Sequence, residues 1–332
     1  MKALVLNGIK QLAIEDLEQP KPQDDEVLVK IAYAGICGTD KHLYGGLPGS
    51  APAEPPIVLG HENSGTVAAI GKNVTNVKVG DRVAIDPNIY KDDDFYTRTG
   101  RPELSDGLSA VGVTRDGGFE EYTTAPSSVV YAIPENVSFK AAAMIEPISC
   151  VIHGINLIKL TPYQKALVIG DGFIGQLFVQ ALQSYGVHQV DAAGISDEKL
   201  KKMKELGAVE TFNTLKDDIK SGYDIVVEAV GLPATQKAAI EMAAKGGQVL
   251  MFGVGKPDQT FEINTYEIFQ KQLTIQGSFI NPFAFEDSIA LLQSGNIEAE
   301  SLISHELSLE EVEDCLEGKI ENVNKAVVKV SD

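Results

Sequence analysis

Two short motifs in the N-terminal part of the chain contain side chains that bind metal ions. Residues 35–40 (Gly-Ile-Cys-Gly-Thr-Asp) contribute Cys37, and a Gly-His-Glu motif contributes His61 and Glu62. A thiolate, an imidazole and a carboxylate form a borderline-soft ligand set that selects zinc. Glu146 is a fourth candidate, because a carboxylate in an apolar stretch is costly unless it is paired or metal-bound. The motifs predict one zinc site and leave open whether Glu62 or Glu146 is the direct ligand.

A glycine-rich turn later in the chain predicts a dinucleotide site. The pattern Gly-x-Gly-x-x-Gly occupies residues 170–175, after an apolar predicted strand and at the start of a predicted helix. The first glycine allows a tight turn, the second lets the backbone approach a pyrophosphate, and the third lets the helix pack on the strand. The phosphates then meet the positive N-terminus of the helix. The expected cofactor contacts are Gly170, Gly172, Phe173, Ile174, Gly175, Gly194, Ser196, Lys199, Val230 and Val254.

The choice between NAD and NADP is expected to depend on the residues after the next predicted strand. An NAD site usually has an acidic residue about 20 positions beyond the glycine turn, where it binds the adenosine ribose. Gly194 stands near that position. Without a carboxylate there, a 2′-phosphate meets no repulsion, and Ser196, Lys199 and Lys202 are available to contact it. We therefore predict a slight preference for NADP, with Asp191 as the alternative NAD-binding acid if the strand ends earlier.

The elements that must position these residues are of two kinds. Up to Phe139 the chain is rich in glycine, proline and short β-type runs, which predicts a β-rich barrel. From Lys165 onward, predicted strands and helices alternate, which indicates a parallel sheet covered by helices on both faces. A last helix and strand return to the first domain. We predict an α/β protein with a catalytic domain at residues 1–148 and 282–332 and a doubly wound dinucleotide-binding domain at residues 149–281.

Composition and charge limit the possible partners. The chain of 332 residues has 28 basic and 47 acidic side chains and a formal net charge of −19, which argues against nucleic acid or an anionic membrane as a partner. No apolar run approaches the ~18–20 residues needed to cross a bilayer. The three cysteines, Cys37, Cys150 and Cys315, do not form a disulfide framework, so we expect a reducing, cytoplasmic location.

The motifs resemble those of zinc-dependent medium-chain alcohol dehydrogenases, most closely the sorbitol (polyol) dehydrogenase branch. The resemblance covers essentially the whole chain and rests on residues 35–40, Gly60-His61-Glu62 with Gly65, residues 80–83, residues 117–122, Glu146-Pro147 and the glycine turn. It implies a catalytic zinc on Cys37, His61 and Glu62, with Glu146 near or on the metal. It also implies a GroES-like catalytic domain joined to a Rossmann domain, and a homodimer or homotetramer.

One departure from this family is visible in the sequence. The family commonly holds a structural zinc on four cysteines spaced C-x2-C-x2-C-x7-C. The matching positions in this chain are Lys91, Asp94, Thr97 and Ser105. None of these side chains is a thiolate, so we predict that the chain has no structural zinc.

The resemblance also implies a reaction and a path for its proton. Zinc would act as a Lewis acid on an alcohol while the nicotinamide accepts a hydride. Thr39 and His42 are three residues apart, so one helical turn would place them on one face. The family suggests a relay from the substrate through Thr39 and the cofactor ribose to His42. The alternative is that His42 is an ordinary surface histidine.

The prediction for the whole chain is an enzyme that interconverts a secondary alcohol or polyol with its ketone, using NAD or NADP. An alternative substrate is a sugar-alcohol phosphate or an amino alcohol. A different class, a non-catalytic dinucleotide-binding protein, is disfavoured because Cys37, His61, Glu62, Glu146 and Thr39 occur together.

Overall fold

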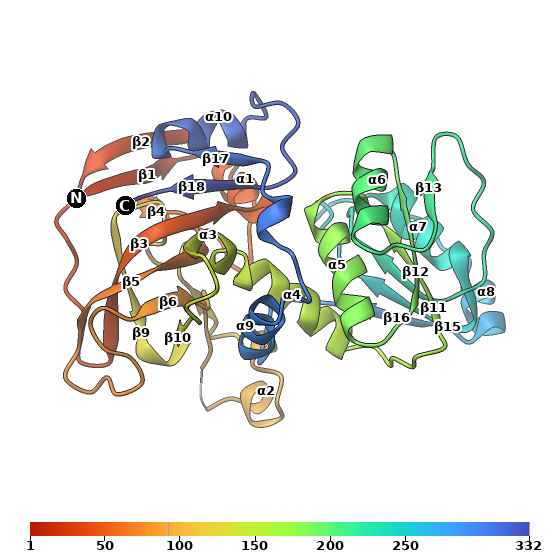
Figure 1. Cartoon of the computed structure of the whole chain (residues 1–332), viewed down its shortest axis with the longest axis horizontal. Helices are drawn as coiled ribbons and strands as arrows, with labels where there is room; N and C mark the ends of the chain where they lie inside the picture. The colour runs from red at the N-terminus through yellow and green to blue at the C-terminus, as the bar shows by residue number, and fades with distance from the viewer. Residues whose placement is uncertain (92, 332) are drawn as a thin grey trace. The chain divides into compact units, whose positions relative to one another are not determined.

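A computed structural model describes residues 1–91 and 93–331 of the chain. The chain divides into two compact units. Unit 1 comprises Met1–Ser149 and Ile280–Asp332, and unit 2 comprises Cys150–Phe279. Figure 1 shows a β-rich unit that contains both ends of the chain and a second unit in which strands and helices alternate.

Unit 1 is organised around the long strand β3 (Glu26–Ile36). Its residues Val27, Val29 and Ile31 are fully buried, as their alternation along the strand predicts. One edge of β3 pairs with β5, and the other edge pairs first with β9 and then with β18. The main sheet has the order β10-β6-β5-β3-β18-β17, with β9 also paired to β3. This pairing brings the last strand of the chain back beside the N-terminal motifs.

The other elements of unit 1 are short, as expected from its many glycines and prolines. Its remaining strands are β1 (Lys2–Gly8), β2 (Gln11–Asp16), β4 (Ile57–Val58), β5 (Glu62–Ile70), β6 (Arg82–Ile85), β7 (Asn88–Ile89), β8 (Ser109–Ala110), β9 (Tyr122–Pro126), β10 (Val130–Ala132), β17 (His305–Leu307) and β18 (Ala326–Lys329). Its helices are α1 (Gly38–Tyr44), α2 (Phe95–Arg98), α3 (Phe139–Ala142), α9 (Phe285–Gln293) and α10 (Val312–Leu316), with 3-10 turns at Pro102–Leu104, Ser127–Val129, Glu300–Leu302 and Leu309–Glu311.

Unit 2 is a doubly wound parallel sheet. Its six strands have the order β13-β12-β11-β14-β15-β16, and every adjacent pair is parallel. The strand order reverses between the neighbouring strands β11 and β14. In doubly wound sheets, ligands bind at the carboxyl ends of the strands on either side of such a reversal. The strands are β11 (Lys165–Ile169), β12 (Gln189–Gly194), β13 (Thr211–Asn213), β14 (Tyr223–Glu228), β15 (Ala243–Met251) and β16 (Thr274–Gly277). The helices are α5 (Phe173–Ser184), α6 (Asp197–Glu205), α7 (Pro233–Met242) and α8 (Thr265–Lys271).

The predicted fold class, a GroES-like β-rich domain with a Rossmann domain, is confirmed. Helix α4 (Ile145–Asn156) begins two residues before Pro147. Proline is tolerated there because residues of the first helical turn have no intrahelical acceptor for their N–H groups. The chain therefore passes from unit 1 to unit 2 within one helix.

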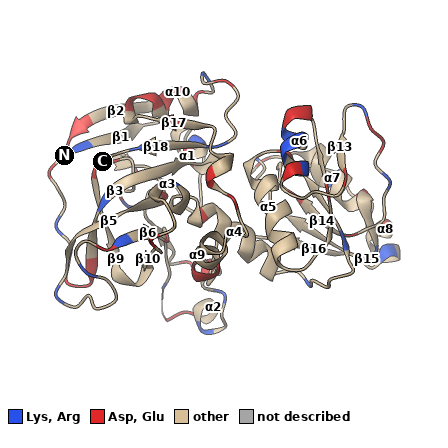
Figure 2. Cartoon of the chain, in the orientation of Figure 1, with Lys and Arg blue, Asp and Glu red and all other residues tan. Residues whose placement is uncertain are grey.

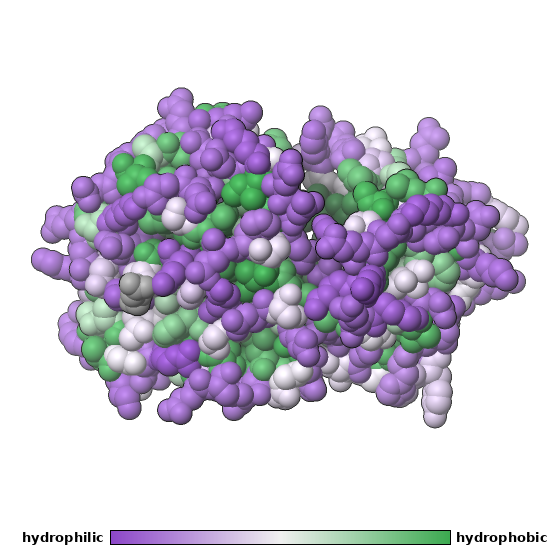
Figure 3. Space-filling view, turned by 45° about the horizontal axis from the view of Figure 1, so that its top comes forward, coloured by the Kyte–Doolittle hydropathy of each residue, from purple (hydrophilic) through white to green (hydrophobic). Residues whose placement is uncertain are grey.

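The surface agrees with the acidic composition of the chain. Acidic and basic residues occur along both units rather than in a single tail (Figure 2). Hydrophilic residues cover much of the face drawn in Figure 3, and hydrophobic residues appear there as separate patches. In the described part of the chain, the helices are too short or too polar to cross a lipid bilayer.

Candidate metal centre and cofactor site

The ends of two paired strands bring the predicted metal ligands together. Cys37 directly follows β3, and His61 and Glu62 stand at the start of β5, whose register places Glu62 opposite Gly35. One ligand atom from each of the three side chains lies within 4.8 Å of the others. A Cβ atom at Gly35 would lie 1.8 Å from Oε2 of Glu62, so the glycine is what allows this close packing.

Asp40 orients the ligands but was not selected by the sequence reasoning. Its Oδ2 accepts the backbone N–H of Cys37 at 2.8 Å, and its Oδ1 lies 3.4 Å from Nδ1 of His61. Burial by itself would lower the pKa of His61, but Asp40 and Cys37 together raise that pKa well above its usual value. The site thus stabilises positive charge. The signal for Asp40 was its place three residues after Cys37, the spacing of a capping box.

Lys325 is the second residue that local sequence patterns did not reveal. Its ammonium donates to Oε1 of Glu62 at 2.7 Å and to the backbone oxygen of Ile36 at 3.0 Å. Both Glu62 and Lys325 are buried. Burial lowers the pKa of Lys325, but the charges of Glu62 and Cys37 outweigh that effect and raise it. Lys325 precedes β18, and it reaches Glu62 only because β18 pairs with β3.

The donor set fits a zinc ion. Oδ1 of Asp40 lies 3.4 Å from Nδ1 of His61, and Oε2 of Glu62 lies 2.5 Å from Nζ of Lys325. A carboxylate beside an imidazole is the pairing that orients a metal-binding histidine, and the thiolate, imidazole and carboxylate are ligand types that zinc takes. Glu146 is buried in the first turn of α4, and its charge acts on Lys325, but it is not a member of the three-residue cluster.

Thr39 and His42 both lie on helix α1, as predicted. Both side chains are partly exposed, and the helix begins directly after Cys37. The two relay candidates therefore lie three residues apart on the helix that follows the first candidate metal ligand.

The glycine turn of unit 2 has the geometry that a dinucleotide requires. Gly170 has a φ of +127°, and a Cβ at Gly175 would lie 1.8 Å from the oxygen of Gly170. A Cβ at Gly172 would meet nothing within 4 Å, so this position offers open space at the start of α5. Phe173 and Ile174 form the first residues of that helix. The turn thus combines a tight bend, close helix packing and free approach to a helix N-terminus.

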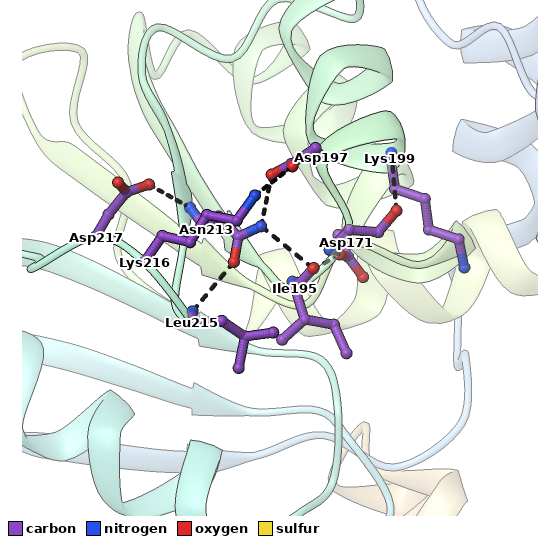
Figure 4. Close-up of polar contacts among 9 residues, drawn as sticks. Asp171, Ile195, Asp197, Lys199, Asn213, Leu215, Lys216 and Asp217 are labelled. Carbon is purple, nitrogen blue, oxygen red and sulfur yellow. Dashed lines mark hydrogen bonds and ion pairs between the residues drawn. The ribbon is translucent and has the colours of Figure 1, made fainter.

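The second cofactor segment lies at the end of β12. Ser196 is the N-cap of α6, and its hydroxyl accepts the backbone N–H of Lys199. Asp191 is fully buried earlier in β12, where it contacts Lys165 at 3.1 Å and Tyr223 at 3.0 Å. Asp191 therefore does not stand at the strand end where an NAD-binding acid would be needed. A different acid lies at this strand end. Asp171, which the sequence patterns did not single out, accepts hydrogen bonds from the N–H groups of Ile195 and Ser196 (Figure 4).

Val230 and Val254 follow β14 and β15 at the same edge of the sheet, and both are exposed. Their loops pack closely, since a Cβ at Gly231 would lie 2.6 Å from the oxygen of Val254. Buried Glu228 holds the first loop by accepting the N–H groups of Val230 and Gly231 at 3.0 and 2.9 Å. Glu228 is the last residue of β14, and no local sequence motif identifies it as a residue that holds this loop.

The four positions that match the structural-zinc cysteines of the family are linked by hydrogen bonds. Asp94 caps α2 by accepting the N–H of Thr97 at 2.8 Å, and the hydroxyl of Thr97 donates to the oxygen of Lys91 at 2.5 Å. Hydrogen bonds from Ser105 and Thr97 lower the pKa of Asp94. Arg101 adds a cation–π contact with Tyr96, 5.6 Å from the ring centre.

Comparison with protein families divides the chain at similar places. Residues 23–135 match the alcohol dehydrogenase GroES-like domain, and residues 174–294 match the zinc-binding dehydrogenase family. The chain is 32% identical to D-arabinitol dehydrogenase 1 of Uromyces fabae, with 96% of this chain and 93% of that protein covered. It is 31% identical to sorbitol dehydrogenase of Bacillus subtilis, with 98% and 96% covered.

Solved structures are similar over the full length. A zinc-binding dehydrogenase from Sinorhizobium meliloti bound to NADP has a TM-score of 0.95 and 32% identity, with 99% of this chain and 98% of that chain covered. An Escherichia coli protein described as a short chain alcohol dehydrogenase, complexed with NADH, has a TM-score of 0.91 and 31% identity, with 99% of both chains covered. These two similar structures contain different nicotinamide cofactors.

Proposed function

Because this chain belongs to the zinc-dependent medium-chain alcohol dehydrogenase family, we propose that Cys37, His61 and Glu62 hold its catalytic zinc, with Glu146 as a further ligand. The protein is a zinc-dependent oxidoreductase that transfers a hydride between an alcohol or polyol and NAD(P). The observation that carries the ligand assignment is the cluster of three ligand atoms within 4.8 Å of one another. We further propose that residues 1–148 with 282–332 form the catalytic domain and that residues 149–281 form the cofactor domain.

The surroundings of the cluster support a role in catalysis. When bound, zinc supplies a Lewis acid that makes an alcohol more acidic. Asp40 orients the imidazole of His61, and Lys325 holds the carboxylate of Glu62 by an ion pair, so the ligands are positioned before the ion binds. Three ligand atoms within 4.8 Å of one another, held by such neighbours, are what a preorganised site requires.

Proton removal is assigned to helix α1. We propose that the Thr39 hydroxyl accepts the alcohol proton as it gives up its own, and that His42, one helical turn later, receives a proton by way of the cofactor ribose and releases one to water. Both residues are partly exposed, which supports a path from a dry site to solvent. His42→Gln should lower turnover near neutral pH and keep the zinc content unchanged. An unchanged pH profile of kcat would remove His42 from the mechanism.

For the cofactor, we propose that the enzyme accepts both dinucleotides with a slight preference for NADP. Gly194 contributes no side chain at the end of β12, and Ser196 and Lys199 follow it on α6. These residues can contact a 2′-phosphate, and Lys199 adds a positive charge. Measured kcat/KM values for NADP and NAD test this preference, and a strong preference for NAD would contradict it.

We propose that the chain binds no structural zinc. Asp94, Thr97 and Ser105 are engaged in hydrogen bonds with one another and with Lys91, which supports a segment held without a metal. Metal analysis of the purified protein should give about one zinc per chain, as expected for a single site of four ligands. Two tightly bound zinc ions would contradict the proposal.

The assembly is proposed to be a homodimer or a homotetramer. Strand β16 is at the edge of its sheet, and Ile275 on this strand is exposed, as are Tyr266 and Phe269 on α8. An apolar edge strand is a template for pairing with a second copy. Ile275→Lys should reduce the molar mass measured by light scattering if this edge is used. We also propose a cytoplasmic location, which is supported by three cysteines that form no disulfide.

The substrate assignment is tested with a panel of secondary alcohols and polyols, each with NAD and NADP, before and after chelation. We expect turnover that disappears with the zinc and returns when zinc is added back. Phosphorylated polyols and amino alcohols in the same panel test the alternative substrates. Full turnover by zinc-free enzyme would overturn the proposed chemistry, and absence of turnover with tight dinucleotide binding would favour the non-catalytic alternative.

A further inference from the structure

We propose that Asp171 selects between NAD and NADP, because its carboxylate lies where the acid of an NAD site would otherwise stand. This inference rests on the proposed function, in which the glycine turn binds a nicotinamide dinucleotide. In an NAD site the acid at the end of the second strand binds the ribose hydroxyls, and this chain has Gly194 there. The carboxylate at this place comes from the glycine turn.

The two segments concerned are neighbours because their strands are paired. The register of β11 and β12 places Ile169 opposite Ala193, and the N–H of Gly170 donates to the oxygen of Ala193 at 2.8 Å. Asp171 is the next residue of the glycine turn. Its Oδ2 accepts the N–H groups of Ile195 at 2.8 Å and Ser196 at 2.7 Å. These bonds fix the carboxylate over the end of β12 (Figure 4).

Gly194 leaves the space that the side chain of Asp171 occupies. A Cβ at Gly194 would lie 2.4 Å from Cβ and 2.5 Å from Cγ and Oδ2 of Asp171. Such distances are shorter than real contacts, so a side chain at position 194 and the observed position of Asp171 exclude each other. The same small volume therefore receives one carboxylate, and in this chain the glycine turn supplies it.

The neighbouring charges indicate what this carboxylate does. The N–H groups of Ile195 and Ser196 both donate to Oδ2 of Asp171. Among the described residues, these bonds leave Oδ1 available to a ribose hydroxyl. The other acid of this segment, Asp197, is bound by Asn213 at 2.6 Å and by Lys216 at 2.5 Å, so its charge is already paired. Asp171 is thus the carboxylate that opposes a 2′-phosphate, whereas Lys199 attracts one. This opposition keeps the preference for NADP slight.

The first test is Asp171→Asn in the zinc-loaded enzyme. The amide oxygen of Asn can still accept the two backbone N–H groups, but the negative charge is gone. Dissociation constants for NAD and NADP are measured by isothermal titration calorimetry. We expect the ratio Kd(NAD)/Kd(NADP) to rise by about tenfold or more, because a like charge beside the phosphate has been removed.

The matched control is Asp197→Asn, which removes an acid from the same turn. Since that charge is paired with Lys216, the ratio should change by less than about twofold. A ratio that is unchanged in Asp171→Asn, or equal changes in the two variants, would overturn the role of Asp171. If the wild-type protein binds neither dinucleotide, it is the proposed function that fails. If it binds them and the ratio does not respond, only this inference fails.

A swap of the two positions tests the spatial equivalence directly. Gly194→Asp alone should weaken the binding of both cofactors, because the new side chain collides with Asp171. Asp171→Ala should favour NADP. The double variant, Asp171→Ala with Gly194→Asp, should return the ratio to within about threefold of wild type, since a carboxylate is again present. A double variant with the same ratio as Asp171→Ala would show that the two positions are not equivalent.

Discussion

The candidate metal centre and the capped start of helix α2 belong to the same unit but hold a carboxylate in opposite ways. In the metal centre Glu62 is 0% exposed and faces the ammonium of Lys325. In the other segment Asp94 is partly exposed and is held by an N–H group and a hydroxyl. Removing a charge from water is costly, so the buried carboxylate of Glu62 gains from an opposite charge, whereas neutral hydrogen bonds are sufficient for Asp94 near water.

Asp86 lies between these two extremes. It is buried like Glu62, but its hydrogen-bond donors are the neutral groups of Asn88 and Asn281. Burial raises the pKa of Asp86 to about 7. At Asp86 the neutral donors therefore do not offset the cost of burial, and this acid keeps its proton below about pH 7. The comparison predicts a graded series of responses to mutation and pH.

The largest effect is expected where the ligand itself is removed. Cys37→Ala should lose zinc and lower kcat/KM by about 10³-fold or more, because a Lewis acid supplies several kcal/mol of transition-state stabilisation. Zinc content and turnover are measured on the same preparation. Cys315→Ala, which removes a thiol from α10 in the same unit, should keep both. A Cys37→Ala enzyme with full zinc and full activity would contradict the ligand assignment.

The next effect concerns the buried ion pair. In the zinc-free protein, Lys325→Met leaves the carboxylate of Glu62 without a cation and should lower the free energy of unfolding by about 3–5 kcal/mol, measured by urea denaturation in the presence of a chelator. Lys325→Arg keeps the charge and should retain more of the stability. Lys319→Met is the control, since this exposed lysine pairs with Asp314 at the surface and its loss should have little effect. Equal stability of Lys325→Met and wild type would refute the need for a counter-charge.

The buried acid without a cation should show itself in the pH dependence of stability. Between about pH 4 and pH 7 the folded state keeps a proton on Asp86 that the unfolded state has released, so stability falls as pH rises through this window. The difference should amount to roughly 2–4 kcal/mol. Asp86→Asn should remove this part of the slope, measured as the urea midpoint from pH 4.5 to pH 8. Parallel curves for the two proteins would disprove the assignment.

The smallest effect is expected in the segment near water. Asp94→Ala removes the N-cap of α2 and should lower Tm by about 2 °C without changing kcat. The contribution of Asp94 is present above its unfolded pKa and is lost as pH falls through its lowered folded pKa. Asp93→Ala is the matched control, because Asp93 offers only its backbone oxygen to Arg98. A large loss of activity in Asp94→Ala would place this segment in the catalytic machinery.

Local patterns were sufficient for much of the fold. The alternation of strands and helices predicted the parallel sheet, and the glycine turn at residues 170–175 stands between β11 and α5 as expected. These features depend on residues a few positions apart, so a short stretch of sequence contains them. Strand ends are less well defined by such patterns, so the sequence leaves Asp191 as an alternative NAD-binding acid, whereas the structure buries it beside Tyr223.

The sequence by itself determined the kinds of chemical group that this protein can use: a thiolate, an imidazole and a carboxylate near its start, and a glycine turn for a dinucleotide. Only the tertiary structure decided which groups face one another. Lys325 is 263 residues from Glu62, and Asp171 meets Gly194 through the pairing of two strands. The physical reason is that the residue type fixes the charge of a side chain, whereas the pairing of distant strands decides which oppositely charged side chain lies beside it.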